Sequence, residues 1–356
     1  MNALKAKLML GIFLLVLLLV STSCAPAVST GTWPALRVSE GKLYVATQGG
    51  RIYALEAATN AEVWQYPPAS ERKLVASNSA PTVEGSSAYV GTADNHVYAI
   101  DVNTGSSRWD HQGSGRIYGE IALDSGNLYF GEGTKVCALD AATGAKRWEF
   151  STRAGVWGRP AVSDGRVFAG SLDHRLYCID AASGVELWHY EAGGAIASGV
   201  VVASDTVYFG ALDSAVYAVA TGNPELRWKF STGHWVWATP LLQDGTLYVG
   251  SLDRKIYALD AATGSKAREF QAAGMVRATP ALADGLLYAG TESGTLQVFE
   301  TSSGAVKWTA DAGTSILSSP VVDGGVVYAG ALGDTVFAWN AETGAPLWNV
   351  NPGKRK

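Results

Sequence analysis

The feature that most constrains the fold of this chain is an internal repeat with a period near 40 residues. A short segment of the type Leu-Tyr-Val-Gly recurs, and its fourth residue falls at Ala46, Gly91, Gly131, Gly170, Gly210, Gly250, Gly290 and Gly330. The spacing is 40 residues at five of the seven steps, with one step of 45 and one of 39. Such regularity predicts a series of eight similar structural units.

Each repeat is expected to form four short strands. In the sixth, Asp244 and Gly245 separate residues 239–242 from residues 246–250, and a polar loop then leads to residues 255–260. Asp-Gly pairs suit tight hairpins because glycine adopts positive φ at no steric cost. No helical pattern lies between the strands, which excludes a doubly wound α/β fold. We therefore predict an all-β, eight-bladed β-propeller of four-stranded antiparallel blades, in which ring closure protects the strand edges.

The fourth segment of a repeat normally carries a tryptophan four residues after a glycine. This position holds Trp64, Trp109, Trp148, Trp188, Trp228, Trp308 and Trp348, and the sixth repeat has Arg268 in place of the tryptophan. The pattern Tyr-Ala-Leu-Asp-Ala-Ala-Thr-Gly-x-x-x-Trp resembles the tryptophan-docking repeat of the quinoprotein dehydrogenases, the PQQ-like propeller family. The resemblance implies that each of these tryptophans packs between its own blade and the next.

Two repeats depart from the pattern, and two cysteines lie within it. Residues 220–224 interrupt the fifth repeat, and Gln297 replaces the usual tyrosine in the seventh. Cys137 occupies the tyrosine slot of the third repeat and Cys178 the neighbouring alanine slot of the fourth. Adjacent slots on a strand point to opposite sheet faces. We therefore expect two buried free thiols rather than a disulfide, although export would permit one.

The N-terminal segment has the layout of an export signal. Lys5 and Lys7 precede the apolar residues 8–20, and the small residues 21–23 lead to Cys24. The apolar run is shorter than the roughly 20 residues that span a bilayer. A cysteine directly after small residues resembles a bacterial lipobox, in which the cysteine is lipidated. The expected organisation is a signal at 1–23, a lipidated cysteine and tether at 24–31, and one propeller at 32–356.

An ordinary cleaved signal that ends near Ser23 or Ala25 is the alternative to lipidation at Cys24. With the lipid anchor, the protein is expected to be exported and attached to the cell envelope. It would face the periplasm from the outer membrane, or lie on the cell surface where only one membrane exists. The membrane is then a partner through the lipid anchor only.

Composition and motifs argue against several functions. Lys and Arg number 27 against 32 Asp and Glu, so no basic excess points to nucleic acid. Three distant cysteines supply neither a disulfide scaffold nor a zinc site. No Ser/His/Asp arrangement, phosphate-binding loop or His-x-x-x-His motif is found. The resemblance implies adjacent cysteines and a bound calcium or lanthanide in the dehydrogenases, and this chain has no Cys-Cys pair. We therefore expect no enzymatic activity, cofactor or metal.

A second set of aromatic residues lies outside the docking positions. Three residues before the proline position of each inner strand, the repeats hold Trp33, Asn78, Tyr118, Trp157, Ala197, Trp237, Arg277 and Leu317. Arg159, His234 and Trp235 are close to this slot. The loops concerned share one face of a propeller, so these side chains are expected around one mouth of its channel. Aromatic and arginine side chains are typical of a binding hot spot; the alternative is that the rings only fill the wide centre of the ring.

Within the PQQ-like group, a lipid-anchored propeller without a cofactor site is similar to the BamB family of outer-membrane assembly lipoproteins. The resemblance implies a monomeric scaffold whose loops contact a protein partner, the β-barrel insertase. An extracytoplasmic binding protein for a glycan or a peptide is the alternative function. A PQQ-dependent dehydrogenase is the less favoured one.

Overall fold

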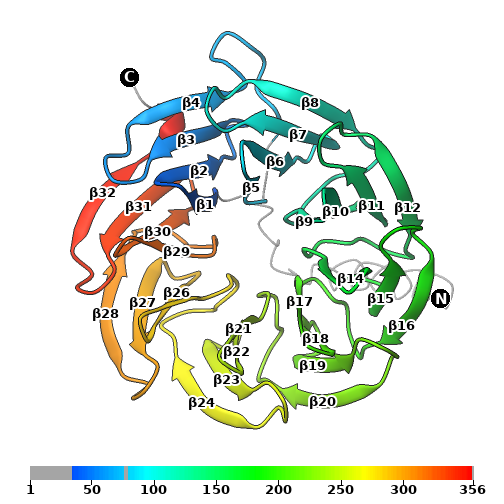
Figure 1. Ribbon diagram of the computed structural model, residues 1–356. Helices are drawn as coiled ribbons and strands as arrows, with labels where there is room; N and C mark the ends of the chain where they lie inside the picture. Colours follow the sequence, from blue (N-terminus) through cyan, green and yellow to red (C-terminus); the bar gives the residue numbers. More distant parts are fainter. Residues whose placement is uncertain (1–33, 76–78, 355–356) are drawn as a thin grey trace, which may run out of the picture. The chain divides into compact units, whose positions relative to one another are not determined.

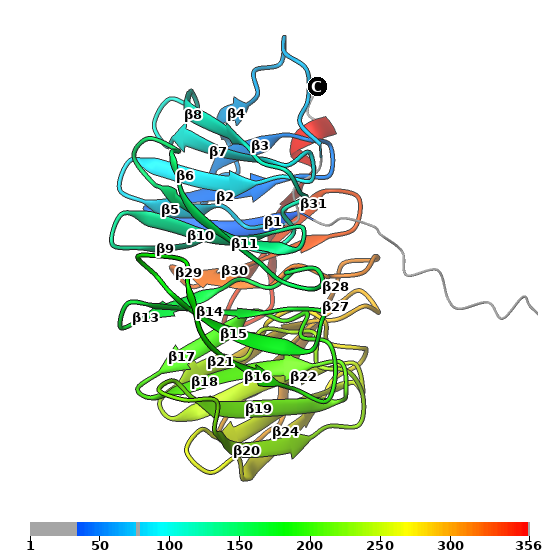
Figure 2. The ribbon, with the colours of Figure 1, turned by 90° about the vertical axis from the view of Figure 1, so that its right-hand side faces the viewer.

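The computed structural model describes residues 34–75 and 79–354, which form eight four-stranded antiparallel sheets in a ring (Figure 1). This confirms the predicted eight-bladed β-propeller. Seen from the side, the strands run from one face of the ring to the other (Figure 2). The expected lipidation site Cys24, together with Trp33 and Asn78, lies outside the described residues. No helix in the described ranges is long and apolar enough to cross a membrane.

Each blade consists of four consecutive strands, from the channel outward. The innermost strands are β1 (Ala35–Ser39), β5 (Thr82–Glu84), β9 (Ala122–Asp124), β13 (Ala161–Ser163), β17 (Val200–Ala203), β21 (Leu241–Gln243), β25 (Ala281–Ala283) and β29 (Val321–Asp323). The second strands are β2 (Lys42–Ala46), β6 (Ser87–Gly91), β10 (Asn127–Glu132), β14 (Arg166–Gly170), β18 (Thr206–Ala211), β22 (Thr246–Ser251), β26 (Leu286–Gly290) and β30 (Val326–Ala331).

The third strands are β3 (Ile52–Glu56), β7 (His96–Asp101), β11 (Lys135–Asp140), β15 (Arg175–Asp180), β19 (Ala215–Ala220), β23 (Lys255–Asp260), β27 (Thr295–Glu300) and β31 (Thr335–Asn340). The outermost strands are β4 (Glu62–Tyr66), β8 (Ser107–Gln112), β12 (Lys146–Ser151), β16 (Glu186–Glu191), β20 (Leu226–Ser231), β24 (Lys266–Gln271), β28 (Val306–Asp311) and β32 (Pro346–Val350). A short 3-10 helix, η1 (Pro352–Lys354), follows the last blade.

The hydrophobic core lies between the blades and not at the centre of the ring. The second and third strands are buried on both faces, as in β22 and β23, because each blade is covered by a neighbour on either side. The buried apolar side chains form eight clusters, and each cluster joins two adjacent blades. The innermost strands are therefore left to line a central space.

The docking tryptophans bond each blade to the next. Six of them donate their indole N–H to a backbone carbonyl in the turn of the following blade, for example Trp64 to Val102 at 2.8 Å. The ring packs on a glycine of that turn: a Cβ on Gly144, whose φ is +72°, would lie 2.6 Å from the ring of Trp109. We call the seven tryptophans and Arg268 the docking girdle.

Arg268, on the outermost strand of the sixth blade, takes over the docking bond with a different side chain. Its guanidinium donates to the carbonyl oxygens of Ser302 and Ser303, each at 2.7 Å, and it packs beside Gly304. The interrupted turn of the fifth blade also keeps its bond, since the carbonyl of Thr221 accepts from Trp188 at 3.2 Å. The departures from the repeat are thus accommodated with the docking bonds intact.

The first and last blades meet as two complete sheets, because no strand is exchanged between the ends of the chain. Asp334 accepts hydrogen bonds from the backbone N–H groups of Gln48 and Gly49 at 2.7 and 2.9 Å. The indole nitrogen of Trp348 is buried here without a hydrogen-bond partner in the described residues. The turn that it faces has Asn60, at φ 55°, where the other turns mostly have glycine. The closing interface therefore lacks one bond of the docking girdle.

Both cysteines of the propeller are buried, as predicted, and neither is in a disulfide. They lie in different clusters of the core. Cys137 donates through its thiol to the buried Glu132 carboxylate at 3.1 Å, and burial raises the pKa of the Cys178 thiol to about 12. Both thiols are therefore protonated at neutral pH and inert as nucleophiles. Gln297 likewise has a partner, since its side-chain oxygen accepts from the backbone N–H of Ala273 at 2.6 Å.

Candidate functional site

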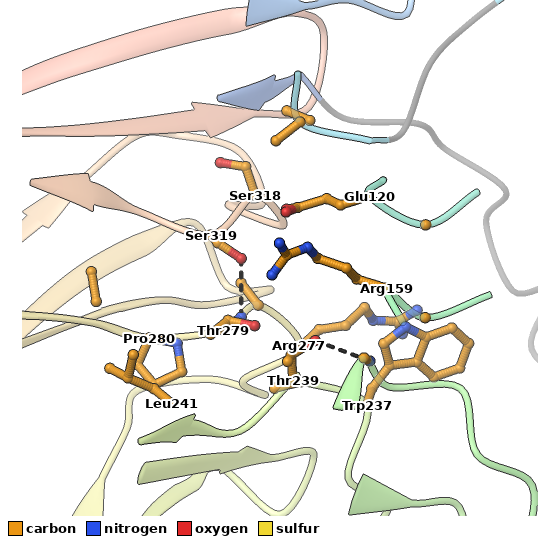
Figure 3. A pocket seen from close by; sticks show the side chains of 18 of the residues that line it. Glu120, Arg159, Trp237, Thr239, Leu241, Arg277, Thr279, Pro280, Ser318 and Ser319 are labelled. Atoms are coloured by element: carbon orange, nitrogen blue, oxygen red, sulfur yellow. Dashed lines mark hydrogen bonds between the residues drawn. The ribbon is translucent and has the colours of Figure 1, made fainter. Parts of the chain in front are cut away.

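The described residues enclose a cavity of about 580 Å³ on the axis of the ring, and every blade contributes to its wall. The segments that line it are the loops before the innermost strands and the first residues of those strands (Figure 3). These loops and the loops between second and third strands form one face, which we call the mouth face. Backbone hydrogen bonds join the two sets of loops, as from Leu252 N–H to the carbonyl of Trp235 at 3.0 Å.

Four of the predicted site residues form a continuous row at the mouth face. The ring centroids of Tyr118 and Trp157 are 5.7 Å apart, and those of Trp157 and Trp237 are 6.0 Å apart. The guanidinium of Arg277 lies 4.9 Å from the Trp237 ring, in a cation–π contact. The two tryptophans belong to the fourth and sixth blades and meet because the fifth blade has the small Ala197 in this slot. We call Tyr118, Trp157, Trp237 and Arg277 the aromatic row.

A second exposed group lies beside the row. His234 and Trp235 pack against each other with ring centroids 5.4 Å apart, and Trp235 is 42% exposed. Met275, at the same slot of the next repeat, is 43% exposed. Sequence reasoning missed Met275, although its place two residues before Arg277 matches that of Trp235 before Trp237. The mouth face over the sixth and seventh blades thus presents two large apolar side chains to solvent.

The exposed large apolar residues of the described chain fall into two groups. The first lies in loops of the mouth face and consists of Val75, Trp157, Trp235 and Met275. The second lies in or next to the outermost strands and consists of Val63, Val185, Leu187, Leu226, Val306 and Leu347. Those of the second group are aliphatic and spread over the blades, whereas the first group includes both exposed tryptophans.

Deeper in the cavity are charged side chains. Arg37 and Glu120 form an ion pair at 3.3 Å, and Arg37 also donates to the carbonyl of Pro81. Arg159 projects into the cavity beside Glu120 (Figure 3). Burial lowers the pKa of the Arg159 guanidinium; the charge of Glu120 opposes this effect and that of Arg37 adds to it. An arginine remains protonated in spite of such a shift.

The wall of the cavity is held by hydrogen bonds between neighbouring blades. The Thr239 hydroxyl accepts from the backbone N–H of Gly199 at 3.0 Å, and the Ser319 hydroxyl accepts from that of Thr279 at 3.2 Å (Figure 3). Each of these bonds joins residues 40 positions apart, so the same slot of adjacent repeats comes into contact.

The structure places the predicted site residues at two depths. The aromatic row and Arg159 line the cavity, whereas the His234–Trp235 pair lies at the mouth face outside the cavity wall. Arg37 and Glu120 could not be predicted from the sequence, because their contact joins the first and third blades, which are not adjacent in the ring. In the described ranges, no group of three or more His, Cys, Asp or Glu side chains has a geometry suited to a metal ion.

Eight four-stranded blades with a docking girdle define the class of protein: a β-propeller built from PQQ-like repeats. The family model described as "Outer membrane protein assembly factor BamB" matches residues 20–155, 116–228, 173–280 and 269–355. The chain therefore belongs to this family. No curated protein matches the sequence.

Three solved structures share the fold at 16% sequence identity. The computationally designed protein Ika8 has a TM-score of 0.78 and covers 87% of this chain and 96% of its own. BamB from Moraxella catarrhalis has a TM-score of 0.70, and the match covers 86% of this chain and 93% of the BamB chain. The quinohemoprotein alcohol dehydrogenase ADHIIG from Pseudomonas putida HK5 has a TM-score of 0.68, and the match covers 85% of this chain and 69% of the dehydrogenase chain. The fold is thus shared by an assembly factor and by an enzyme.

Proposed function

We propose that this protein is a non-catalytic binding protein of the cell envelope that presents its mouth face to a protein partner. The observation that carries the proposal is the gathering of Trp157, Trp235 and Met275, all exposed, in the loops of that face. Large apolar side chains next to arginine are typical of the centre of a protein–protein interface. The aromatic row keeps Trp157 in place through its contacts on two sides.

The partner that we propose is the β-barrel insertase of the outer membrane. Membership of the BamB family supports this role, because the family model is described as an assembly factor of outer membrane proteins. The propeller would act as a monomer and hold the insertase through its loops. No nucleic acid is proposed as a partner, since the chain carries a net charge of −5.

A pull-down from detergent-solubilised envelopes tests the partner. We expect the full-length lipoprotein to retain the insertase and the Trp235→Ala, Met275→Ala double variant to lose it at least tenfold. The Val185→Ala, Leu187→Ala double variant is the matched control, because it removes two exposed apolar side chains near the outermost strand β16. Equal recovery with both double variants would contradict the proposed face, and recovery of a sugar polymer would favour the glycan-binding alternative.

The membrane attachment that we propose runs through the lipid on Cys24, with a signal at 1–23 and a tether at 24–31. Each buried CH₂ of a lipid chain contributes about 0.8 kcal/mol to membrane binding, so two or more chains give stable anchoring. The Cys24→Ser variant is expected in the soluble fraction with an unchanged thermal midpoint. A variant that stayed with the membrane after a high-salt wash would place the attachment elsewhere.

The dehydrogenase alternative is tested by reconstitution. The residues do not fit the quinone site that the resemblance implies: the sequence has no adjacent cysteines, and Cys137 and Cys178 lie in different clusters. We expect no stoichiometric chromophore after incubation with PQQ and calcium. A bound quinone together with oxidation of an alcohol or a sugar would overturn the proposal of a non-catalytic protein.

A further inference from the structure

The cavity contains an arginine whose charge has no bonded counterpart. Three arginines line it: Arg37 is paired with Glu120 and Arg277 with Glu292 at 2.7 Å, whereas the guanidinium of Arg159 makes no hydrogen bond or ion pair with the described residues. Its side chain is exposed to the cavity and points into it (Figure 3). Three arginines and two glutamates leave this group of side chains with one net positive charge.

The fold does not require a cation at this place. The corresponding slot of the other repeats holds Ala35, Ala80, Glu120, Gly199, Thr239, Thr279 and Ser319. Arg159 is therefore the one positive charge in this layer of the eight blades. An anionic ligand in the cavity would pair with this guanidinium, which has no bonded acidic partner among the described residues.

Two hydroxyl groups across the cavity complete a set of donors. Thr239 and Ser319 each accept a backbone N–H through the hydroxyl oxygen. A hydroxyl has one proton and two lone pairs, so the proton of each remains available to a ligand. Ser319 belongs to the eighth blade and Arg159 to the fourth, and these blades are opposite each other in the ring (Figure 1).

We propose that the cavity binds a small hydroxylated carboxylate, of the chemical class of the sugar acids, with its carboxylate on Arg159 and its hydroxyls on Thr239 and Ser319. A guanidinium matches a carboxylate with two parallel N–H···O bonds. The volume of about 580 Å³ lies in the range of small-molecule pockets. At the entrance, the exposed ring of Trp157 offers an apolar surface to the carbon face of a sugar.

This site goes beyond the proposed partner binding and does not depend on it, because the ligand is expected to bind the isolated protein. Calorimetry with the purified full-length protein in detergent uses D-glucuronate as the probe. D-glucose, which lacks the carboxylate, and acetate, which lacks the hydroxyls, are the matched probes. We expect glucuronate to bind at least tenfold more tightly than either.

Three variants sharpen the test. Arg159→Gln is expected to weaken glucuronate binding at least tenfold, while Arg153→Gln, which removes an exposed arginine that does not line the cavity, leaves it unchanged. Glu120→Gln is expected to strengthen binding, because it frees the charge of Arg37. Thermal midpoints of all three variants show that they are folded.

Three results would overturn the inference: no heat of binding with glucuronate at millimolar concentration, wild-type affinity in Arg159→Gln, or acetate binding as tightly as glucuronate. Should Arg159→Gln not fold, unchanged affinity in Glu120→Gln would count against it in the same way. Failure of the proposed partner would instead appear as loss of the insertase from the pull-down, with glucuronate binding unaffected.

Discussion

The docking girdle and the aromatic row use the same residue types in opposite ways. In the girdle, six of the seven indoles are bonded to the next blade, as Trp228 is to the carbonyl of Ala261 at 2.9 Å, and the pattern is repeated around the ring. In the row, the rings of Trp157 and Trp237 contact each other and make no hydrogen bond to a neighbouring blade among the described residues, and the slot that they occupy holds six different residue types in the eight repeats.

The comparison distinguishes residues that are required at every interface between blades from residues that are required at a single site. Each interface between blades has to exclude water, so the same solution recurs at each of them. A binding site on the axis is needed at one place only, and the residues around it are free to differ. Irregular positions within a regular repeat are therefore the more informative ones about function, and the residues of the row, with Arg159, lie at such positions.

The largest expected difference is between Trp228→Ala and Trp237→Ala. The first variant opens a cavity between two blades and is expected to cost about 3–5 kcal/mol of unfolding free energy. The second removes a partly exposed ring from the mouth face and is expected to cost about 1 kcal/mol or less. Urea unfolding of both variants measures the difference. Equal midpoints would show that the row is core filling, as the alternative interpretation of the sequence holds.

A smaller difference is expected between two glycines of similar backbone conformation. Gly126 and Gly144 have φ of +74° and +72°, but a Cβ on Gly126 meets nothing within 4 Å, whereas one on Gly144 meets Trp109. Gly126→Ala is expected to cost about 1–2 kcal/mol from the left-handed backbone alone. Gly144→Ala adds about 1–3 kcal/mol of overpacking against the indole. Similar thermal midpoints for the two variants would mean that the girdle tolerates displacement of its rings.

The closing interface allows the girdle's hydrogen bond to be isolated. Trp64→Phe removes an indole N–H that is bonded to Val102, whereas Trp348→Phe removes one that has no partner among the described residues. Trp64→Phe is therefore expected to be the more destabilising by about 1 kcal/mol. If chemical denaturation gave equal losses, the bond would contribute nothing beyond the packing of the ring.

The smallest effect is expected from a charge next to the girdle. Hydrogen bonds from Lys135 and Lys146, each at 2.9 Å, lower the pKa of Glu149 to about 2, below its unfolded value of about 4.3. The stabilisation that Glu149 gains from the two lysines is thus fully present at a pH above its unfolded-state pKa, and it is lost as the pH falls toward 2. Glu149→Gln should reduce the difference in urea midpoint between pH 6 and pH 3, by an amount that salt diminishes. An unchanged difference would show that the lysines do not hold this carboxylate in solution.

The fold could be predicted from the sequence because each blade is encoded locally. The spacing of the glycines and of the docking tryptophans determines the number of blades, and Asp-Gly pairs mark their turns. Even the exception at Arg268 was visible as a substitution, although its two bonds to Ser302 and Ser303 were not.

The site could be predicted only in part, because it is formed across the ring. The slot three residues before the proline position predicts the members of the aromatic row, but the contact of Trp157 with Trp237 depends on the small Ala197 between them. The pairing of Arg37 with Glu120 joins residues 83 positions apart, and only this pairing shows that Arg159 is left without an acidic partner. The repeat in the sequence predicts which residues of adjacent blades meet, but it does not predict contacts between blades that are not adjacent.

The meeting of the first and last blades as complete sheets has a consequence for the order in which the molecule is made. Seven of the eight core clusters join blades that are adjacent in sequence, so they can form while the chain is still emerging. The eighth brings Leu43 of the first blade against Val336 of the last. Until the last blade has been synthesised, the first blade keeps one apolar flank uncovered. The growing chain therefore exposes an apolar surface until its synthesis is complete, and a chaperone would find its binding site on the blade made first.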